Sequence, residues 1–140
     1  GLRIGDILKM SSKELFNGSK TFREEKTNKA KTVVFNDAIK NALSTFDLTD
    51  ESIFKSQKGT VFSRQQINRK IKKHFKQPAD KNYSSHSLRK SFGRRVYENN
   101  DQSEKALMYL SELYNHSSLK ITRGYLDITQ EELNDVYMNL

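Results

Sequence analysis

One stretch of the sequence joins a histidine to a tyrosine nine residues later: Asn115-His116-Ser117-Ser118-Leu119-Lys120-Ile121-Thr122-Arg123-Gly124-Tyr125. Serine side chains accept hydrogen bonds from the free amides of a first helical turn, so the two serines predict a helix that begins after them. On that helix Ile121 and Tyr125 lie four residues apart and share a face. Aromatic residues at this spacing are most often core residues. Taken alone, the stretch leaves Tyr125 either as a packing side chain or as a phenol directed at a ligand.

The composition fits one domain. The chain has 140 residues, one proline and 34% hydrophobic residues, which is enough for a modest core. It contains no cysteine, so disulfides and thiolate metal sites are unavailable, as expected for a protein of the reducing cytoplasm. It shows neither a signal peptide nor an apolar run near the roughly 18 residues of a membrane span. We therefore expect a soluble cytoplasmic protein with no membrane partner.

The charge balance indicates a polyanionic partner. Lys and Arg number 25 against 17 Asp and Glu, which gives a net charge of +8. A well-solvated basic surface is the alternative. No acidic residue occurs between Val61 and Gln77. The basic residues of this segment suit contacts with a phosphate backbone, unless they only solvate a helix, and they are Arg64, Arg69, Lys70, Lys72, Lys73 and Lys76.

Helical spacing dominates the chain. Asn36 and the capping boxes Ser63–Gln66 and Thr129–Glu132 mark three helix starts. The helix after Ser63 is expected to bury Ile67, Ile71 and Phe75. Other apolar faces are formed by Ile4, Ile7 and Leu8; by Ile39, Ala42, Leu43 and Phe46; by Leu88, Phe92 and Val96; by Ala106, Leu107, Leu110, Leu113 and Tyr114; and by Leu133, Val136, Tyr137 and Leu140.

Residues 21–35 break this pattern and predict strand, turn and strand. The second arm is rich in β-branched residues. Asn28 tolerates the left-handed conformation of a tight hairpin, so Lys26 and Lys29 would flank an exposed turn. Exposed loop lysines ordinarily serve solubility, and on position alone that interpretation is favoured here.

Two further positions carry possible anion ligands. His86 and Arg89 lie three residues apart in the first turn of a predicted helix, where the dipole favours an anion. His86 as a simple helix cap is the alternative. Arg3 stands beside the apolar face that begins at Ile4, and by position alone an ion pair with Asp6 is favoured.

Several common chemistries lack support in the sequence. We find no glycine-rich phosphate loop, no run of metal-ligand histidines and no serine nucleophile motif. The singled-out residues are two arginines, two histidines, a lysine and a tyrosine. A tyrosine can attack phosphorus, two guanidiniums can fork the nonbridging oxygens, and a lysine can protonate the departing oxygen.

These residues, in this order, resemble the catalytic domain of the tyrosine recombinases, the phage integrase family. Gly-Leu-Arg at 1–3 is similar to the segment of the family's first catalytic arginine, and Lys26 in Lys-Thr-Asn-Lys matches the hairpin lysine. His86-Ser-Leu-Arg89 matches the His-x-x-Arg box. The stretch from His116 to Tyr125, with Thr122 three before the tyrosine, matches the terminal histidine and nucleophile. The likeness covers nearly the whole chain.

Two positions depart from the usual pattern. Asn115 replaces the glycine often found before the second histidine, and Lys90 follows Arg89 where another histidine is frequent. Neither is a catalytic position of the family. The family's catalytic domain also starts well before its first arginine, after a separate DNA-binding domain. By resemblance, residues 1–140 would be an N-terminally truncated catalytic domain, mainly α-helical with a small antiparallel β-hairpin (α+β).

The resemblance implies a role for each residue. Arg3 and Arg89 would clamp the scissile phosphate, His116 would donate to its oxygen and His86 would assist proton movement. Tyr125 would attack to form a 3′-phosphotyrosine, and Lys26 would protonate the 5′-hydroxyl. No cofactor and no metal is implied. The packing role in this region would then pass to Ile121 and Leu126.

The resemblance also implies partners. Double-stranded DNA would be the substrate of a site-specific recombinase or integrase of a mobile element. The full-length protein would form a tetramer on DNA and associate with the bacterial nucleoid, whereas the free fragment would be a monomer. In the family the last helix, here 129–140, is often passed to a neighbouring protomer. Two alternatives stay open: relaxation of DNA in the manner of a type IB topoisomerase, and a non-catalytic DNA-binding module.

Overall fold

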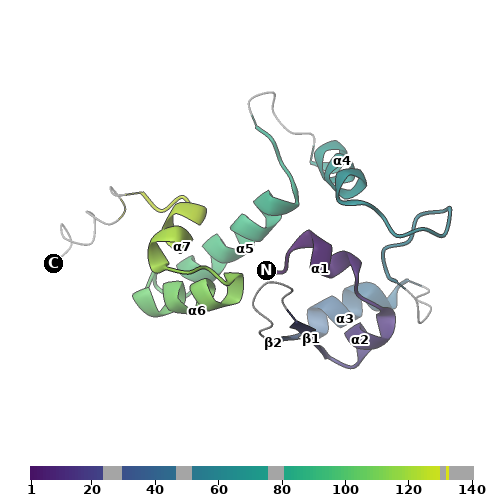
Figure 1. Cartoon of the computed structure of the whole chain (residues 1–140), viewed down its shortest axis with the longest axis horizontal. Coiled ribbons are helices and arrows are strands. Elements are labelled where there is room, and N and C mark those ends of the chain that lie inside the picture. The colour runs from purple at the N-terminus through teal and green to yellow at the C-terminus, as the bar shows by residue number, and fades with distance from the viewer. Residues whose placement is uncertain (24–29, 47–51, 76–80, 130–131, 133–140) are drawn as a thin grey trace. The chain divides into compact units, whose positions relative to one another are not determined.

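The computed structural model describes residues 1–23, 30–46, 52–75, 81–129 and 132 (Figure 1). This part of the chain is mainly helical and contains one two-stranded antiparallel sheet, which confirms the expected fold class. Within it, no helix is long and apolar enough to cross a membrane. The elements in chain order are α1 (Ile4–Leu8), α2 (Ser12–Phe16), β1 (Ser19–Arg23), β2 (Ala30–Val34), α3 (Asp37–Ser44), α4 (Arg64–His74), α5 (Ser85–Glu98), α6 (Glu104–Tyr114) and α7 (Leu119–Tyr125).

The chain divides into two compact units. The amino-terminal unit comprises Ile4–Ile67, and the carboxy-terminal unit comprises Asn68–Leu140 together with Gly1–Arg3. The division falls within α4. Arg3 therefore belongs to the carboxy-terminal unit, although it precedes the amino-terminal unit in sequence.

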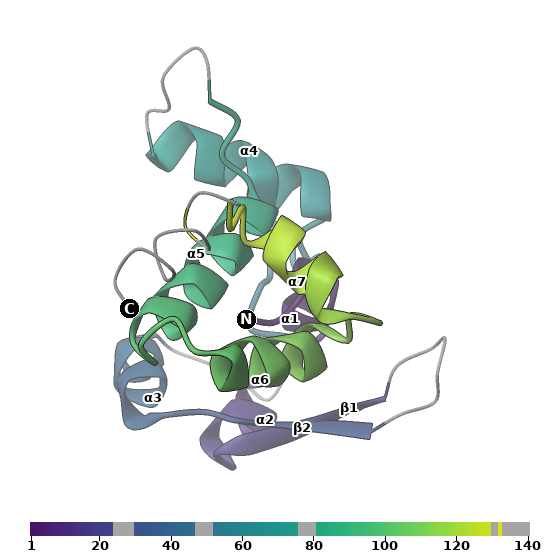
Figure 2. The same cartoon turned by 90° about the vertical axis from the view of Figure 1, so that its left-hand side faces the viewer.

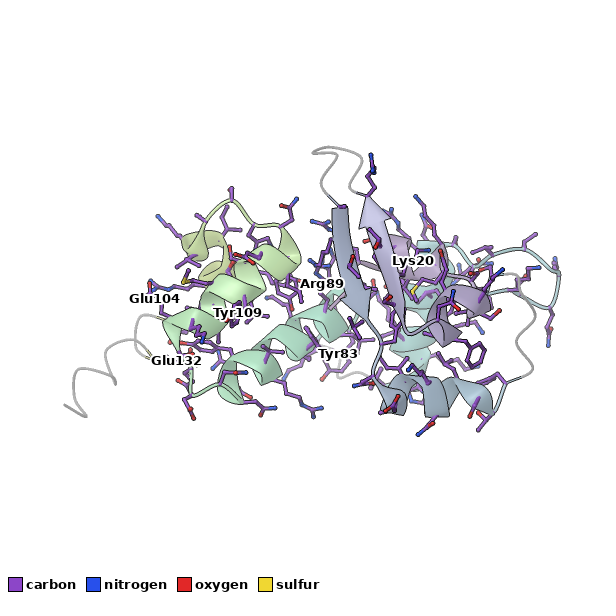
Figure 3. All side chains as sticks on the ribbon, turned by 90° about the horizontal axis from the view of Figure 1, so that it is seen from below. Lys20, Tyr83, Arg89, Glu104, Tyr109 and Glu132 are labelled. Carbon is purple, nitrogen blue, oxygen red and sulfur yellow. The ribbon has the colours of Figure 1, made fainter. Side chains whose placement is uncertain are left out.

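The amino-terminal unit is organised around the hairpin. Strands β1 and β2 pair from Ser19 opposite Val34 to Arg23 opposite Ala30, and α2 lies against β1 (Figure 2). Lys20 of β1, labelled in Figure 3, forms a 2.7 Å ion pair with Glu14 of α2. The predicted strand-turn-strand is confirmed in its strands. The turn with Lys26 and Lys29 lies outside the described residues.

The predicted helix starts at Asn36 and Ser63 are confirmed, and the capping contacts predicted at Thr129 are present. The Asn36 side chain accepts a hydrogen bond from the Ile39 amide at 3.0 Å. In the capping box before α4, the Ser63 amide donates to Gln66 and the Gln66 amide donates to Ser63, at 2.8 and 3.2 Å. Thr129 and Glu132 form the same reciprocal pair at 3.3 and 3.2 Å. The apolar residues that follow, from Leu133 onwards, lie outside the described residues.

The core of the carboxy-terminal unit lies between α5, α6 and α7 (Figures 1 and 2). Asn115 ends α6 in the left-handed conformation, with φ of 54°, and the Ser118 side chain caps α7. The chain therefore turns sharply between the two helices. The buried residues of this core are Tyr97, Ala106, Leu107, Leu110, Tyr114 and Leu126, and they confirm the predicted inner face of α6.

The expected burial of α4 is wrong. Ile67 and Ile71 are only half-buried, and Phe75 is 49% exposed. The helix ends at His74, so Phe75 follows its last turn. There its ring packs edge-on against His74 and Tyr83, with centroids 5.1 and 6.3 Å apart. Two apolar residues on a helix rich in basic side chains form a stripe too narrow for a core face.

The expected packing of α7 is half correct. Leu126 is buried, whereas Ile121 is 48% exposed and Thr122 is fully buried. Neighbouring helix positions point about 100° apart, so a helix that buries Thr122 and Leu126 turns Ile121 outward. On α5, too, the buried face lies one residue away from the predicted one. The helix buries Arg89, Gly93 and Tyr97 and leaves Leu88 and Phe92 exposed.

Candidate active site

Helix α5 brings His86 and Arg89 to one end of the carboxy-terminal unit. Its start is fixed by the Ser84 amide, which donates to Ser87 at 3.1 Å, and by the Ser85 amide, which donates to Asn68 at 3.0 Å. His86 is exposed, but Arg89, labelled in Figure 3, is only 8% exposed. The first two turns of α5 therefore present an accessible imidazole and a buried guanidinium.

Arg3 and Arg89 converge on a single carbonyl oxygen. Both donate to the Tyr114 carbonyl, from Nη2 atoms 3.3 and 3.5 Å away. Burial lowers the pKa of Arg89, and the charge of Arg3 lowers it further, while Tyr125 and Tyr114 act in the opposite direction. The two cations are thus held close together despite their repulsion.

Arg89 carries its charge in an unusual environment. Its guanidinium lies over the Tyr114 ring, 4.3 Å from the centroid, which is a favourable cation–π position. Among the described residues, no carboxylate forms a salt bridge with Arg89. Buried charges are normally paired, because desolvation of an isolated ion is costly. A buried cation with this arrangement is suited to an anionic ligand.

His116 is oriented by α7. Its Nδ1 lies 3.0 Å from the hydroxyl of the fully buried Thr122. Burial lowers the pKa of His116, and the nearby charges of Arg89 and Arg3 lower it further. The imidazole is therefore neutral at neutral pH. With Nδ1 on Thr122, Nε2 is the ring nitrogen left for other partners.

Tyr125 is the last residue of α7 and packs among the other site residues. Its ring centroid is 5.2 Å from that of Tyr114, 5.3 Å from that of His116 and 6.3 Å from that of His86, all edge-on. Its hydroxyl lies 3.4 Å from Nδ1 of His86. The phenol is therefore held beside two imidazoles and is only half-buried.

The structure thus brings together five of the six residues singled out as catalytic from the sequence. Arg3, His86, Arg89, His116 and Tyr125 all lie in the carboxy-terminal unit. The sixth, Lys26, lies outside the described residues. In the part of the chain that the structure describes, no three His, Asp or Glu side chains are grouped to hold a metal ion.

Tyr114 organises the site, and sequence reasoning assigned it only to the core. It is fully buried, and its hydroxyl donates to the Arg89 carbonyl at 2.7 Å. Burial raises the pKa of Tyr114 to about 12, so the phenol stays protonated. A Cβ on Gly93 would overlap this hydroxyl and lie 2.7 Å from Leu126 Cδ2. The apolar periodicity of α6 marks Tyr114 as buried but carries no signal of its contact with Arg89.

The basic residues of α4 are exposed. Arg64 begins the helix, and its guanidinium lies against Gly5, so that a Cβ there would be 2.7 Å from Nη2. The predicted backbone-binding residues Arg64, Arg69, Lys70, Lys72 and Lys73 are all accessible to a ligand.

Comparison with known proteins gives a consistent result. The model of the phage integrase family matches residues 1–132. A protein of Bacillus subtilis (strain 168), the probable integrase/recombinase YoeC, is 29% identical over 141 residues, which cover 97% of this chain and 76% of that protein.

Solved recombinases share the fold. The XerA recombinase gives a TM-score of 0.71 at 20% identity over 98% of this chain and 51% of its own. The XerH site-specific recombinase, bound to its difH substrate, gives 0.64 at 22% over 96% and 42%. The Tn1549 transposon integrase, in complex with circular intermediate DNA, gives 0.63 at 17% over 99% and 55%. The chain spans about half the length of these proteins, and the expected recombinase fold is confirmed.

Proposed function

Because the chain belongs to the phage integrase family, we propose that residues 1–140 form the catalytic domain of an enzyme that cleaves and rejoins DNA through a 3′-phosphotyrosine. Family membership and the recombinase fold support site-specific recombination. We further propose the covalent intermediate, a role for each site residue, and a mobile element as the biological setting.

The observation that carries this proposal is the arginine pair beside a tyrosine. Arg89 is buried without a carboxylate partner among the described residues, and its guanidinium shares the Tyr114 carbonyl with Arg3. A phosphodiester supplies the missing negative charge, and planar guanidiniums match its nonbridging oxygens in bidentate fashion. In the trigonal-bipyramidal transition state, charge on these oxygens rises, so a preorganised arginine pair stabilises it most.

Tyr125 is the proposed nucleophile. Its Oη forms a bond to phosphorus while the bond from phosphorus to the 5′ oxygen breaks, and the electron pair of that bond leaves with the 5′ oxygen. The phenolic proton passes towards His86, whose Nδ1 lies 3.4 Å from the hydroxyl. One phosphodiester is exchanged for another phosphate ester, so rejoining needs only the reverse reaction.

His116 and Lys26 complete the proposed chemistry. We assign Nδ1 of the neutral imidazole as the acceptor of the Thr122 hydroxyl proton. The ring proton is then on Nε2, which can donate it to a nonbridging oxygen. Lys26, which lies outside the described residues, would deliver the proton that the departing 5′ oxygen takes up. A lysine suits this task, because its ammonium is a proton donor on a flexible stem.

Double-stranded DNA is the proposed partner. The exposed cations Arg64, Arg69, Lys70, Lys72 and Lys73 on α4 would contact backbone phosphates, which position a duplex without reading its sequence. XerH and the Tn1549 integrase were solved with DNA. We further propose that the whole protein acts on DNA as a tetramer in the cytoplasm.

A nicked suicide substrate tests the function. The nick lets a short 5′ fragment diffuse away after attack, so the protein stays covalently attached to the 3′ phosphate. We expect an adduct with the wild-type protein and none with Tyr125→Phe. Persistence of the adduct in Tyr125→Phe would show that another residue attacks, and absence from the wild type would favour a DNA-binding module.

A second assay separates recombination from topoisomerase activity. Two labelled duplexes that carry the same site are mixed with the protein, and exchange of strands between them is followed on a gel. Exchange is expected for a recombinase. Relaxation of supercoiled plasmid without any exchange would identify a type IB topoisomerase instead.

A further inference from the structure

The chain reverses direction immediately after the proposed nucleophile. Helix α7 ends at Tyr125, and Leu126 is buried against the core. Asp127 follows in the left-handed conformation, with φ of 53°, and the Ile128 amide donates back to the Arg123 carbonyl at 3.1 Å. Left-handed conformations are costly for most residues and are better tolerated by aspartate. The position of the Tyr125 phenol thus depends on what holds Leu126, Asp127 and the described residues after them.

Two cations on α5 hold this segment. Lys90 and Arg94 lie four residues apart and so project from one side of the helix. The Lys90 Nζ is 2.5 Å from Asp127 Oδ2 and 5.9 Å from the centre of the Tyr125 ring. The Arg94 guanidinium binds Glu132 through two nitrogens, with Nη1 3.2 Å from Oε2, and also donates to the Leu126 carbonyl at 3.5 Å.

The two ion pairs differ in strength. The pair between Arg94 and Glu132 is the stronger, because its contacts are bidentate. The Arg94 Nε also binds Glu98, at 3.0 Å. The hydrogen bond from Arg94 lowers the pKa of Glu132. Glu132, labelled in Figure 3, accepts from the Thr129 amide as well. The pair between Lys90 and Asp127 is more exposed, and it borders an open cavity of about 430 Å³ that water can enter.

We propose that Lys90 and Arg94 are positioning residues for the nucleophile. They tie Leu126, Asp127 and Glu132 to the same helix that carries His86 and Arg89, so that this helix positions both the phenol and its partners. Neither residue touches the reacting atoms. The inference rests on the proposed function of Tyr125, and it adds two residues that the catalytic set does not contain.

Arg94→Gln and Lys90→Gln test the proposal, with Arg95→Gln as the matched control. Arg95 is the exposed neighbour on the same helix, so its substitution removes the same charge without touching the segment. At saturating nicked DNA, we expect the adduct rate constant to fall about tenfold in Arg94→Gln, which corresponds to about 1.4 kcal/mol, and less in Lys90→Gln. DNA affinity should match that of the control.

A double-variant cycle tests the Lys90–Asp127 pair. Asp127→Asn removes the carboxylate charge and keeps a residue that tolerates the left-handed conformation. It should lower the adduct rate about as much as Lys90→Gln, and the two substitutions together should lower it little further than either alone. Fully additive rate losses, or rates in the Gln variants equal to those of Arg95→Gln, would overturn the proposal.

Hydrogen exchange separates this proposal from the catalytic one. The amides of Leu126 and Ile128, which donate to Thr122 and Arg123 carbonyls, should exchange faster in Arg94→Gln than in Arg95→Gln. This readout needs no reaction. If the wild type forms no adduct, the proposed function fails while exchange still measures the anchoring. If the wild type reacts but neither exchange nor rate changes in Arg94→Gln, only the positioning role fails.

Discussion

The Tyr114 hydroxyl donates a 2.7 Å hydrogen bond to the Arg89 carbonyl, while the Arg89 guanidinium lies 4.3 Å from the centre of the Tyr114 ring. The tyrosine therefore holds the arginine at both its backbone and its side chain. Its own carbonyl accepts from Arg89 and from Arg3. One buried aromatic residue links both arginines of the proposed phosphate clamp.

Tyr114→Phe should weaken this link without removing the ring. Loss of a buried hydrogen bond costs about 1 kcal/mol of unfolding free energy, which urea denaturation measures. The adduct rate should also fall, because the backbone of Arg89 is less firmly held. An unchanged rate together with lower stability would limit Tyr114 to a packing role.

Arg89→Lys should be poorly tolerated although it preserves the charge. An ammonium cannot form the bidentate fork or lie flat on the Tyr114 ring. We expect the adduct rate to fall on the order of a hundredfold, the usual effect of removing one positioned donor. Single-turnover cleavage gives this rate, and Arg95→Lys on the same helix serves as the comparison. A near-normal rate would argue against Arg89 as a phosphate ligand.

The lowered pKa of His116 predicts a loss of stability in acid. Burial and the charges of Arg89 and Arg3 keep His116 neutral in the folded protein, whereas in the unfolded chain it gains a proton below about pH 6.5. The unfolded state then binds more protons, so the free energy of unfolding falls as the pH drops through this value. Urea denaturation from pH 7.5 to 5 should show a steeper fall for the wild type than for His116→Gln. Equal slopes would contradict the prediction.

Two glycines of the site region should respond in opposite ways to alanine. A Cβ at Gly93 would overlap the Tyr114 hydroxyl and Leu126, whereas a Cβ at Gly124 meets nothing within 4 Å. Gly93→Ala should therefore destabilise by about 1–3 kcal/mol through overpacking. Gly124→Ala should stabilise by up to about 1 kcal/mol, because it lowers the backbone entropy of a helix position. Thermal denaturation of both variants compares them directly.

Lys72→Gln and Lys73→Gln on α4 should weaken DNA binding without slowing chemistry at saturating DNA. Each lost phosphate contact lowers the slope of log affinity against log salt by about 1. Fluorescence anisotropy across a salt series measures that slope. A slope equal to that of the wild type would remove these lysines from the proposed backbone contact.

The sequence predicted much of the fold, and the reasons for its failures are specific. Capping boxes and the hairpin follow from local chemistry, and they were found where Ser63, Thr129 and the β-branched arm placed them. The buried side of a helix depends on its neighbours. On α7 a hydrogen bond between Thr122 and His116 places a threonine inside and leaves Ile121 outside.

In the candidate site, too, contacts between distant segments could not be predicted from local sequence patterns. His86, Arg89, His116 and Tyr125 were singled out because their order resembles a family motif, and the structure gathers them with Arg3. Tyr114 was missed in this role because its contact with Arg89 spans 25 residues of sequence. Such a contact arises only when α5 and α6 pack, so no local pattern contains it.

Left-handed residues lie on both sides of α7, Asn115 four residues before its first residue and Asp127 two residues after its last. Between them the helix has seven residues, about two turns or roughly 10 Å of rise. The length of this helix thus determines the distance and the orientation of the Tyr125 phenol relative to His116. One residue inserted into it would rotate Tyr125 by about 100° and advance it by about 1.5 Å. The number of residues between His116 and Tyr125 therefore determines where the phenol lies. We expect the site to tolerate substitutions in α7 more readily than insertions or deletions.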